Sequence, residues 1–172
     1  MLLKDKIRII EDFPKKGISF KDVTPLLIDG KYYKECTRQL CEQLKDKDVD
    51  LILAPEARGF IFGTTVAYEL GIGFVPVRKE GKLPFETEFI EYELEYGKDK
   101  IEIHKDAIKK GQKVAVVDDL LATGGTVDAI VKLVERMGGE VVSLNFVVEL
   151  TDLNAREKLK GYNISSLVKY NI

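Results

Sequence analysis

Hydrophobic residues along the chain form two kinds of pattern, which alternate from one end to the other. Short apolar runs rich in β-branched residues are typical of strands buried on both faces of a parallel sheet, and they lie at residues 51–54, 73–77, 113–118, 140–149 and 164–168. Apolar residues at helical spacing predict helices over residues 2–10, 31–46, 60–70 and 126–137. Because strands and helices alternate, the pattern predicts the α/β class, with a central, mostly parallel sheet flanked by helices.

Residues 79–104 break this alternation. Apolar or aromatic residues there alternate with glutamates, as in Ile90–Tyr96 and Ile101–Ile103. Strict alternation predicts a two-stranded antiparallel ribbon with one face in water. A long insertion between core strands usually has a function, so a flexible lid is expected, and a surface hairpin without a special role is the alternative.

Composition narrows the class of protein. The length of 172 residues suits one domain over residues 1–172, and 45% hydrophobic and 33% charged residues are ordinary for a globular protein. The formal net charge of -2 gives no indication of a nucleic-acid surface. No apolar run approaches the roughly 20 residues of a membrane helix, and residues 1–6 do not resemble a signal peptide. We therefore expect a cytoplasmic protein.

Cysteine and histidine usage excludes several kinds of site. Cys36 and Cys41 follow a helical pattern, which predicts that both are small packing residues. His104 is the only histidine. A Cys/His zinc site is therefore not available, and serine–histidine or cysteine–histidine catalysis is not expected.

The most informative segment is residues 113–126. An apolar strand leads into Asp118–Asp119, and a loop of small residues, Ala122–Thr126, leads into a helix. Adjacent carboxylates can accept hydrogen bonds from two neighbouring sugar hydroxyls. The loop offers backbone N–H groups and threonine hydroxyls to a phosphate at a helix start. The segment therefore predicts a site for a ribose with a 5-phosphate.

Other interpretations of this segment fit less well. A Walker loop needs a lysine after the glycines, and the dinucleotide fingerprint needs a third glycine; neither is present after Gly124–Gly125. An ordinary glycine-rich turn is the simplest alternative. Two carboxylates at the end of a buried strand repel each other, so a ligand or metal beside Asp118–Asp119 explains them better than a turn does.

Two further segments carry cations next to predicted strands. Arg58 follows the first strand, where it could bind a diphosphate oxygen in bidentate fashion; a local salt bridge with Glu56 is the alternative. Arg78, Lys79 and Lys82 follow the second strand. They could neutralise an anionic leaving group, or they could form a solvated basic turn.

The segment 113–126 resembles the phosphoribosyl-diphosphate (PRPP) binding motif of type I phosphoribosyltransferases. Four further segments occur with it in the order found in the adenine phosphoribosyltransferase family, namely Phe13–Asp22, Glu56–Phe60, Arg78–Pro84 and Leu94–Gly97. The resemblance runs from about residue 10 to residue 150. Lys21 departs from it, because an arginine is expected there.

The resemblance implies a role for each candidate residue. The ribose and the 5-phosphate of PRPP would bind to Asp118, Asp119, Ala122, Thr123, Gly124, Gly125 and Thr126. The diphosphate would bind to Ala57, Arg58, Arg78, Lys79 and Lys82, and adenine to Phe20, Lys21 and Leu120, beneath a hood from residues 1–30. Glu95 and Arg58 would be catalytic, with Glu95 handling a proton of the purine. Mg²⁺ would be held mainly by PRPP, with no direct protein ligand.

The implied reaction joins adenine to PRPP and yields AMP and diphosphate, a step of purine salvage. The family also implies a homodimer, in which Arg78 could reach the neighbouring subunit's site. A phosphoribosyltransferase for hypoxanthine, xanthine or orotate is the alternative enzyme. A PRPP-sensing regulator that binds RNA or DNA is a third reading, against which stand the acidic net charge and the retention of Glu95 and Arg58.

Overall fold

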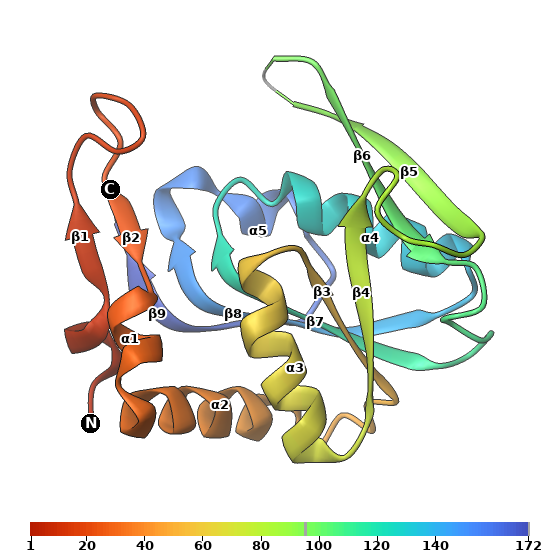
Figure 1. Cartoon of the computed structure of the whole chain (residues 1–172), viewed down its shortest axis with the longest axis horizontal. Helices are drawn as coiled ribbons and strands as arrows, with labels where there is room; N and C mark the ends of the chain where they lie inside the picture. The colour runs from red at the N-terminus through yellow and green to blue at the C-terminus, as the bar shows by residue number, and fades with distance from the viewer. Residues whose placement is uncertain (95, 172) are drawn as a thin grey trace.

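A seven-stranded sheet forms the centre of the molecule (Figure 1). The computed structural model describes residues 1–94 and 96–171. The sheet order is β5-β6-β4-β3-β7-β8-β9, with parallel pairing from β4 through β9 and antiparallel pairing of β6 with both β4 and β5. The strands are β3 (Leu51–Pro55), β4 (Gly73–Lys79), β5 (Thr87–Glu93), β6 (Lys98–His104), β7 (Lys113–Leu121), β8 (Glu140–Leu150) and β9 (Ile164–Tyr170). The predicted mostly parallel α/β architecture is confirmed.

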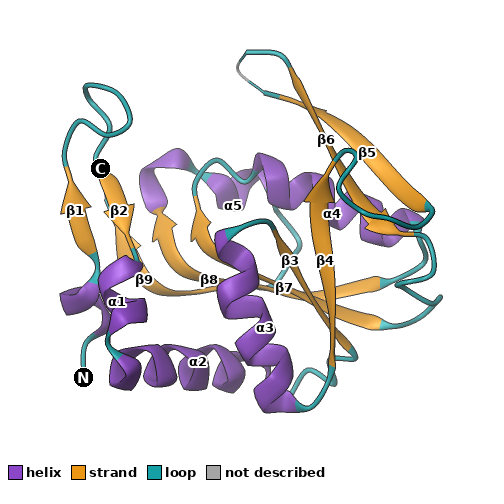
Figure 2. Cartoon of the chain, viewed as in Figure 1, coloured by secondary structure: helices purple, strands orange, loops and turns teal. Residues whose placement is uncertain are grey.

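Helices cover both faces of this sheet (Figure 2). The long helices are α2 (Gly30–Leu44), α3 (Arg58–Leu70) and α4 (Gly125–Arg136). The short elements are α1 (Thr24–Ile28), α5 (Ala155–Lys158) and the 3-10 helices Leu3–Lys6 and Thr151–Leu153. Along β7, Val114 and Val116 join the core beneath α4, whereas Ala115 and Val117 join the core beneath α2 and α3. The continuous apolar run of β7 therefore reflects a strand that is buried on both faces.

The N-terminal segment differs from the predicted helix over residues 2–10. Only Leu3–Lys6 is helical, as a 3-10 turn, and β1 (Arg8–Ile10) then pairs antiparallel with β2 (Phe20–Asp22). So short a helix is marginal without tertiary support, and the β-branched Ile9 and Ile10 suit a strand. The two strands form a separate ribbon beside the sheet (Figure 1).

The hairpin of β5 and β6 confirms the antiparallel ribbon predicted over residues 79–104. It continues the main sheet, because Arg78 of β4 is registered opposite Glu102 of β6. It also rests on α4, where the Arg136 guanidinium donates to the Phe89 carbonyl at 2.9 Å. The ribbon is therefore tied at two points to elements that carry predicted site residues.

Strand β7 is longer than the predicted run of residues 113–118. It continues to Leu121, because Leu120 and Leu121 still pair with β8. Asp118 and Asp119 consequently lie within the strand rather than after its end, and their backbone is fixed by the sheet. The sequence pattern missed this extension because the two aspartates interrupt the apolar run.

The cysteines behave as packing residues in the part of the chain that the structure describes. Cys36, a residue of α2, is fully buried, and burial raises the pKa of its thiol to about 12. Cys41 is partly buried on the same helix, and both thiols are free. Within residues 1–94 and 96–171, no helix has both the length and the apolar character needed to cross a membrane.

Candidate active site

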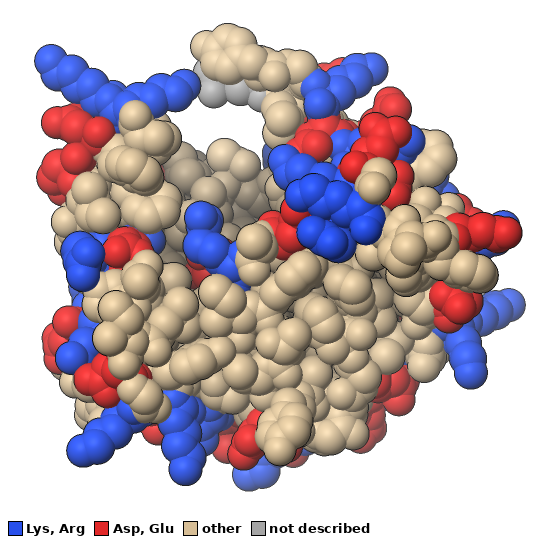
Figure 3. Space-filling view, in the orientation of Figure 1, with Lys and Arg blue, Asp and Glu red and all other residues tan. Residues whose placement is uncertain are grey.

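A cavity of about 470 Å³ lies at the carboxyl ends of β3, β4 and β7. Figure 3 shows this end of the molecule hollowed between the β1–β2 ribbon and the β5–β6 hairpin, with charged side chains gathered on the hairpin side. Strand ends of a parallel sheet are the usual ligand site of α/β proteins. The structure brings the following predicted site residues together in the lining: Ala57, Arg58, Arg78, Lys79, Asp118, Asp119, Leu120, Ala122, Thr123, Gly124, Gly125 and Thr126.

The phosphate-loop candidate ends at the start of α4. Gly124 has φ +85°, a left-handed conformation that favours glycine, and α4 begins at the next residue. A Cβ on Gly124 would lie 3.2 Å from the Ala155 Cβ, so α5 packs directly behind the loop. The loop therefore presents its backbone N–H groups and the positive end of a 12-residue helix to the cavity.

The segment behind the loop was not predicted to matter. The buried Glu149 accepts from the Arg156 Nε at 2.7 Å and from the Arg156 Nη2 at 2.8 Å, which fixes α5 against the end of β8. Ser166 of β9 donates to the same carboxylate at 2.5 Å. No sequence motif marks this support, because its members come from three separate elements.

The carboxylate pair on β7 is held in two different environments. The Asp118 Oδ1 accepts from the Asp119 N–H at 2.8 Å and would lie 2.8 Å from a Cβ on Gly59. Burial and the neighbouring Asp119 charge raise the pKa of Asp118 well above its ordinary value. The Asp119 side chain is 8% exposed and accepts from the Arg58 Nε at 2.5 Å. The charged form of Asp118 is therefore disfavoured, whereas the neighbouring Asp119 forms an ion pair with Arg58.

Each cation of the predicted diphosphate set has a carboxylate neighbour. Arg58 contacts Asp119, and the Lys79 Nζ lies 2.9 Å from the Asp99 Oδ2. Glu56 bonds to the Lys82 ammonium, and its Oε1 lies 3.4 Å from the Arg78 Nε. The local Glu56–Arg58 salt bridge considered from the sequence is therefore not what forms. Lys82 is not among the residues that line the cavity, although its partner Glu56 is.

Three residues of the site were missed by the sequence analysis. Glu56 also accepts from the Lys79 backbone N–H at 2.7 Å, and Asp99 and Tyr92 line the cavity from the hairpin. The Tyr92 hydroxyl lies 3.3 Å from both the Asp99 Oδ2 and the Thr126 Oγ1. Tyr92 and Asp99 face each other across the hairpin, whereas the contacts of Glu56 with Lys79 and of Tyr92 with Thr126 join residues 23 and 34 positions apart, which the sequence pattern does not reveal.

The residues predicted to bind a base lie on two elements. Leu120 lines the cavity from β7, and the Phe20 ring centre on β2 lies 5.8 Å from the Arg58 guanidinium. Lys21 is directed elsewhere, because its ammonium donates to the Ser19 hydroxyl at 2.6 Å and lies 5.1 Å from the Tyr170 ring centre. Neither Lys21 nor Phe20 is among the residues that line the cavity, so Leu120 is the one predicted base-binding residue in its lining. Glu95 falls outside the described residues.

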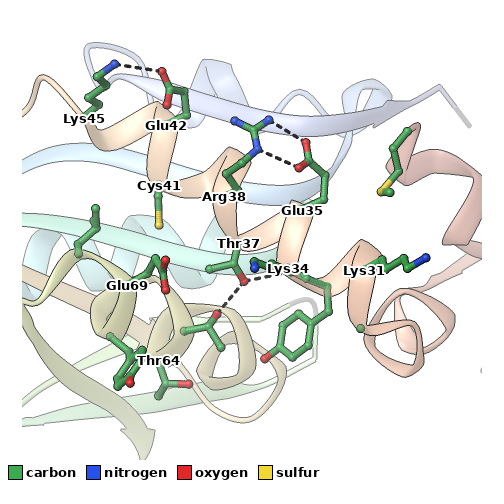
Figure 4. A pocket seen from close by; sticks show the side chains of 16 residues that line it. Lys31, Lys34, Glu35, Thr37, Arg38, Cys41, Glu42, Lys45, Thr64 and Glu69 are labelled. Carbon is green, nitrogen blue, oxygen red and sulfur yellow. Dashed lines mark hydrogen bonds and ion pairs between the residues drawn. The ribbon is translucent and has the colours of Figure 1, made fainter.

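A larger cavity of about 1190 Å³ lies between α2 and α3 (Figure 4). Two ion pairs lie in its lining, Arg38–Glu35 at 2.7 Å and Lys45–Glu42 at 3.6 Å. None of the predicted site residues lines it. Size alone therefore does not identify the site, whereas the convergence of the two motifs does.

Comparisons with known proteins agree with the geometry. A family model described as phosphoribosyl transferase domain matches residues 29–171. A curated adenine phosphoribosyltransferase of Clostridium botulinum (strain Loch Maree / Type A3) is 64% identical over 172 residues, covering both chains completely. The crystal structure of adenine phosphoribosyltransferase from Thermoanaerobacter pseudethanolicus superposes with a TM-score of 0.95 at 60% identity, covering 98% of each chain.

A more distant structure extends the comparison. The adenine phosphoribosyltransferase from Saccharomyces cerevisiae, complexed with an imino-altritol bisphosphate and adenine, has a TM-score of 0.90 at 41% identity, covering 96% of each chain. The resemblance noted in five separate segments thus extends to the whole chain and to its fold. The matches to the family model, to a full-length curated relative and to a solved structure place this chain in the adenine phosphoribosyltransferase family.

Proposed function

We propose that this protein transfers the 5-phosphoribosyl group of PRPP to adenine and releases AMP and diphosphate. The observation that supports this most is the single cavity in which the Asp118–Asp119 pair, the start of α4 and the cations of β4 meet. PRPP carries a ribose diol, a 5-phosphate and a diphosphate leaving group, and each of these needs a binding group in the site. Membership of the family supports adenine as the acceptor.

The ribose phosphate would be bound at the junction of β7 and α4. Backbone N–H groups of residues 122–126 and the hydroxyls of Thr123 and Thr126 would donate to the 5-phosphate. Asp118 and Asp119 would accept from the 2- and 3-hydroxyls of the ribose. Both carboxylates sit on β7, which stays paired with β8 on both sides of them along the strand, from Asp118 to Leu121, so their backbone is held in front of the phosphate loop.

The chemical step is displacement at the anomeric carbon. A bond forms between that carbon and adenine N9, while the bond to the diphosphate oxygen breaks and its electron pair leaves with the diphosphate. Positive charge develops on the ribose ring, near the carboxylates of β7. Negative charge develops on the leaving group, where Arg58, Lys79 and Lys82 would stabilise it together with Ala57 and Arg78. Arg58 and the two lysines must first leave their present carboxylate partners.

Magnesium is proposed to enter with PRPP. Among residues 1–94 and 96–171, no group of three or more His, Cys, Asp and Glu side chains could hold a metal ion. We propose that the ion has no direct protein ligand and is bound near the Asp118–Asp119 pair by substrate oxygens and waters, as Mg²⁺ commonly is. Bound there, Mg²⁺ would supply charge neutralisation for the diphosphate.

The base would be held between Phe20 and Leu120. The β1–β2 ribbon carries Phe20 to the Arg58 guanidinium, so residues 1–30 can form the proposed hood within one domain of residues 1–172. Because the Lys21 side chain points to Tyr170, we propose that Lys21 contributes only main-chain groups. A backbone carbonyl facing the exocyclic amine would favour adenine over the 6-oxo purines.

Glu95 is proposed to handle the purine proton at N7 or N9. Glu95→Gln should lower kcat by about 100-fold, since general acid–base catalysis contributes roughly that factor, with PRPP affinity unchanged. Steady-state kinetics and PRPP binding would be measured on the same preparation. Glu93→Gln is the matched control, because Glu93 is an exposed carboxylate at the end of β5 and lies two positions from Glu95 in the sequence. Turnover of Glu95→Gln close to wild type would remove Glu95 from the mechanism.

We propose that the protein is a cytoplasmic homodimer that uses the α2–α3 face. The side chain of Tyr68 is 86% exposed beside the larger cavity, and Leu70 is exposed next to it. Tyr68→Glu should therefore shift the molar mass in solution from two chains to one, as measured by light scattering. Tyr96→Glu, which alters an equally exposed tyrosine on the hairpin, should leave the mass unchanged. A wild-type protein of one chain would contradict this proposal.

The choice of base is tested by competition. The protein is incubated with PRPP, Mg²⁺ and an equimolar mixture of adenine, hypoxanthine, xanthine and orotate, and the nucleotide products are separated. AMP should be the main product. IMP, XMP or orotidylate as the main product would favour the alternative enzyme, and no nucleotide at all would favour the PRPP-sensing regulator.

A further inference from the structure

A chain of contacts links the diphosphate side of the cavity to the phosphate loop. The Lys79 ammonium lies 2.9 Å from the Asp99 Oδ2, the Asp99 Oδ2 accepts from the Tyr92 hydroxyl at 3.3 Å, and that hydroxyl lies 3.3 Å from the Thr126 Oγ1. All four residues line the cavity. Asp99 and Tyr92 come from the hairpin, whereas Lys79 is the last residue of β4 and Thr126 is the second residue of α4.

In the ion pair of Lys79 with Asp99, both groups are charged, and the two side chains are buried to different extents. The Lys79 side chain is 57% exposed and that of Asp99 only 19%. The hydrogen bond and charge of Lys79 lower the pKa of Asp99, and the same contact raises the pKa of Lys79. The lysine is therefore the member of the pair that can turn toward solvent or toward a bound anion.

Asp99 keeps other donors if Lys79 leaves. Its Oδ1 accepts from the Lys100 N–H at 2.9 Å, and the Tyr92 hydroxyl remains on its Oδ2. Tyr92 is itself fixed, since its hydroxyl also contacts Thr126. A carboxylate with two remaining hydrogen bonds does not lose all its partners when the lysine departs, which lowers the cost of an exchange.

We propose that Asp99, anchored by Tyr92, is an internal counter-anion for Lys79 that competes with the diphosphate of PRPP. In the free protein, Asp99 holds Lys79 at the cavity wall. A diphosphate placed beside Asp99 brings like charges together, so Lys79 turns from the carboxylate to the incoming anion. When the product diphosphate leaves, Lys79 returns to Asp99, which favours release. Asp99 and Tyr92 are thus positioning residues, and this inference rests on the proposed function.

Titration calorimetry with Mg²⁺ and inorganic diphosphate tests the competition without any base. Asp99→Asn should lower the Kd for diphosphate by about fivefold, because Lys79 no longer has a charged partner. If Asp99→Asn merely damaged the site, the Kd for diphosphate would rise. Competition and damage therefore change the Kd in opposite directions. Glu80→Gln is the matched control: its carboxylate pairs with Lys100, and its Kd should change by less than about twofold.

A double-mutant cycle separates competition from a general charge effect. In a Lys79→Met background, Asp99→Asn should lose most of its benefit, because the competing partner is gone. Tyr92→Phe supplies an independent variant: Asp99 keeps fewer donors, holds Lys79 more firmly, and the Kd for diphosphate should rise about threefold. Thermal unfolding of each variant confirms that it is folded.

Three results would overturn the inference: an unchanged or higher Kd in Asp99→Asn, an equal gain with and without Lys79, or an unchanged Kd in Tyr92→Phe. Absence of AMP formation by the wild type would instead count against the proposed function. The two failures are distinguishable, because diphosphate binding is measured with no acceptor base present.

Discussion

Asp118→Asn is expected to reduce AMP formation by about 100-fold while making the folded protein more stable at neutral pH. A charged hydrogen-bond acceptor for a ribose hydroxyl contributes roughly 1.5–3 kcal/mol, and the charge near the developing positive ribose adds to it. Stability should change in the opposite direction, because burial and the Asp119 charge disfavour the ionised Asp118. We expect a gain of about 1 kcal/mol, or about 3 °C in Tm for a chain of this length.

The stability of the folded protein should depend on pH in the direction set by the raised pKa of Asp118. The pKa of Asp118 in the folded protein is raised above the ordinary value of 3.8. The folded state therefore binds more protons than the unfolded state above that pH, and its stability falls as the pH rises through this window. Asparagine does not titrate, so the stability advantage of Asp118→Asn should be larger at pH 8 than at pH 4. Thermal unfolding at both pH values measures it, and a variant less stable than wild type at pH 8 would contradict the account.

Gly59→Ala is expected to lower the rate of AMP formation by at least about tenfold, because it displaces the Asp118 carboxylate. The new Cβ would lie 2.8 Å from the Asp118 Oδ1 and 3.0 Å from the Pro55 Cδ, so Asp118 must move. A shift of about 1 Å in a positioned group can reduce a rate by up to about 100-fold. The measurement is kcat/KM for PRPP, together with the free energy of unfolding.

Gly63→Ala is the control for this effect. It adds a methyl group one turn further along α3, where the Cβ would lie 2.7 Å from the Ala54 Cβ and 3.0 Å from the Phe74 ring. Both substitutions press α3 against the sheet and should destabilise the fold by about 1–3 kcal/mol. Only Gly59 faces Asp118, so only Gly59→Ala should lower kcat/KM in the fully folded protein. Equal kinetic losses in the two variants would show that Asp118 is not specifically displaced.

Local motifs made much of the site predictable. The acid pair, the loop and the helix start of residues 118–126 are contiguous, so their chemistry could be inferred before any fold was known. The strand pattern placed Arg58 after the first predicted strand and Arg78 after the second. The structure makes these strands parallel neighbours, and β4 extends to include Arg78. The structure gathers these residues as that pattern predicts.

Long-range partners were not predictable in this way. The contact between Lys79 and Asp99 depends on the antiparallel pairing of β4 with β6, in which Lys79 is registered opposite Ile101. The sequence indicated a hairpin but not the strand on which it would lie. Likewise, Ala155 packs behind Gly124 because Arg156 is bonded to Glu149, a support that leaves no periodic signal. The N-terminal β1 was misread as helix because its pairing partner β2 lies ten residues away.

The most direct test of the account follows both products of one reaction. Purified protein is incubated with PRPP, Mg²⁺ and adenine, and AMP and diphosphate are quantified together by phosphorus NMR. Each PRPP consumed should yield one AMP and one diphosphate, and Asp118→Asn should slow the formation of both equally. Recovery of unchanged PRPP in the presence of adenine, by a folded protein, would contradict it.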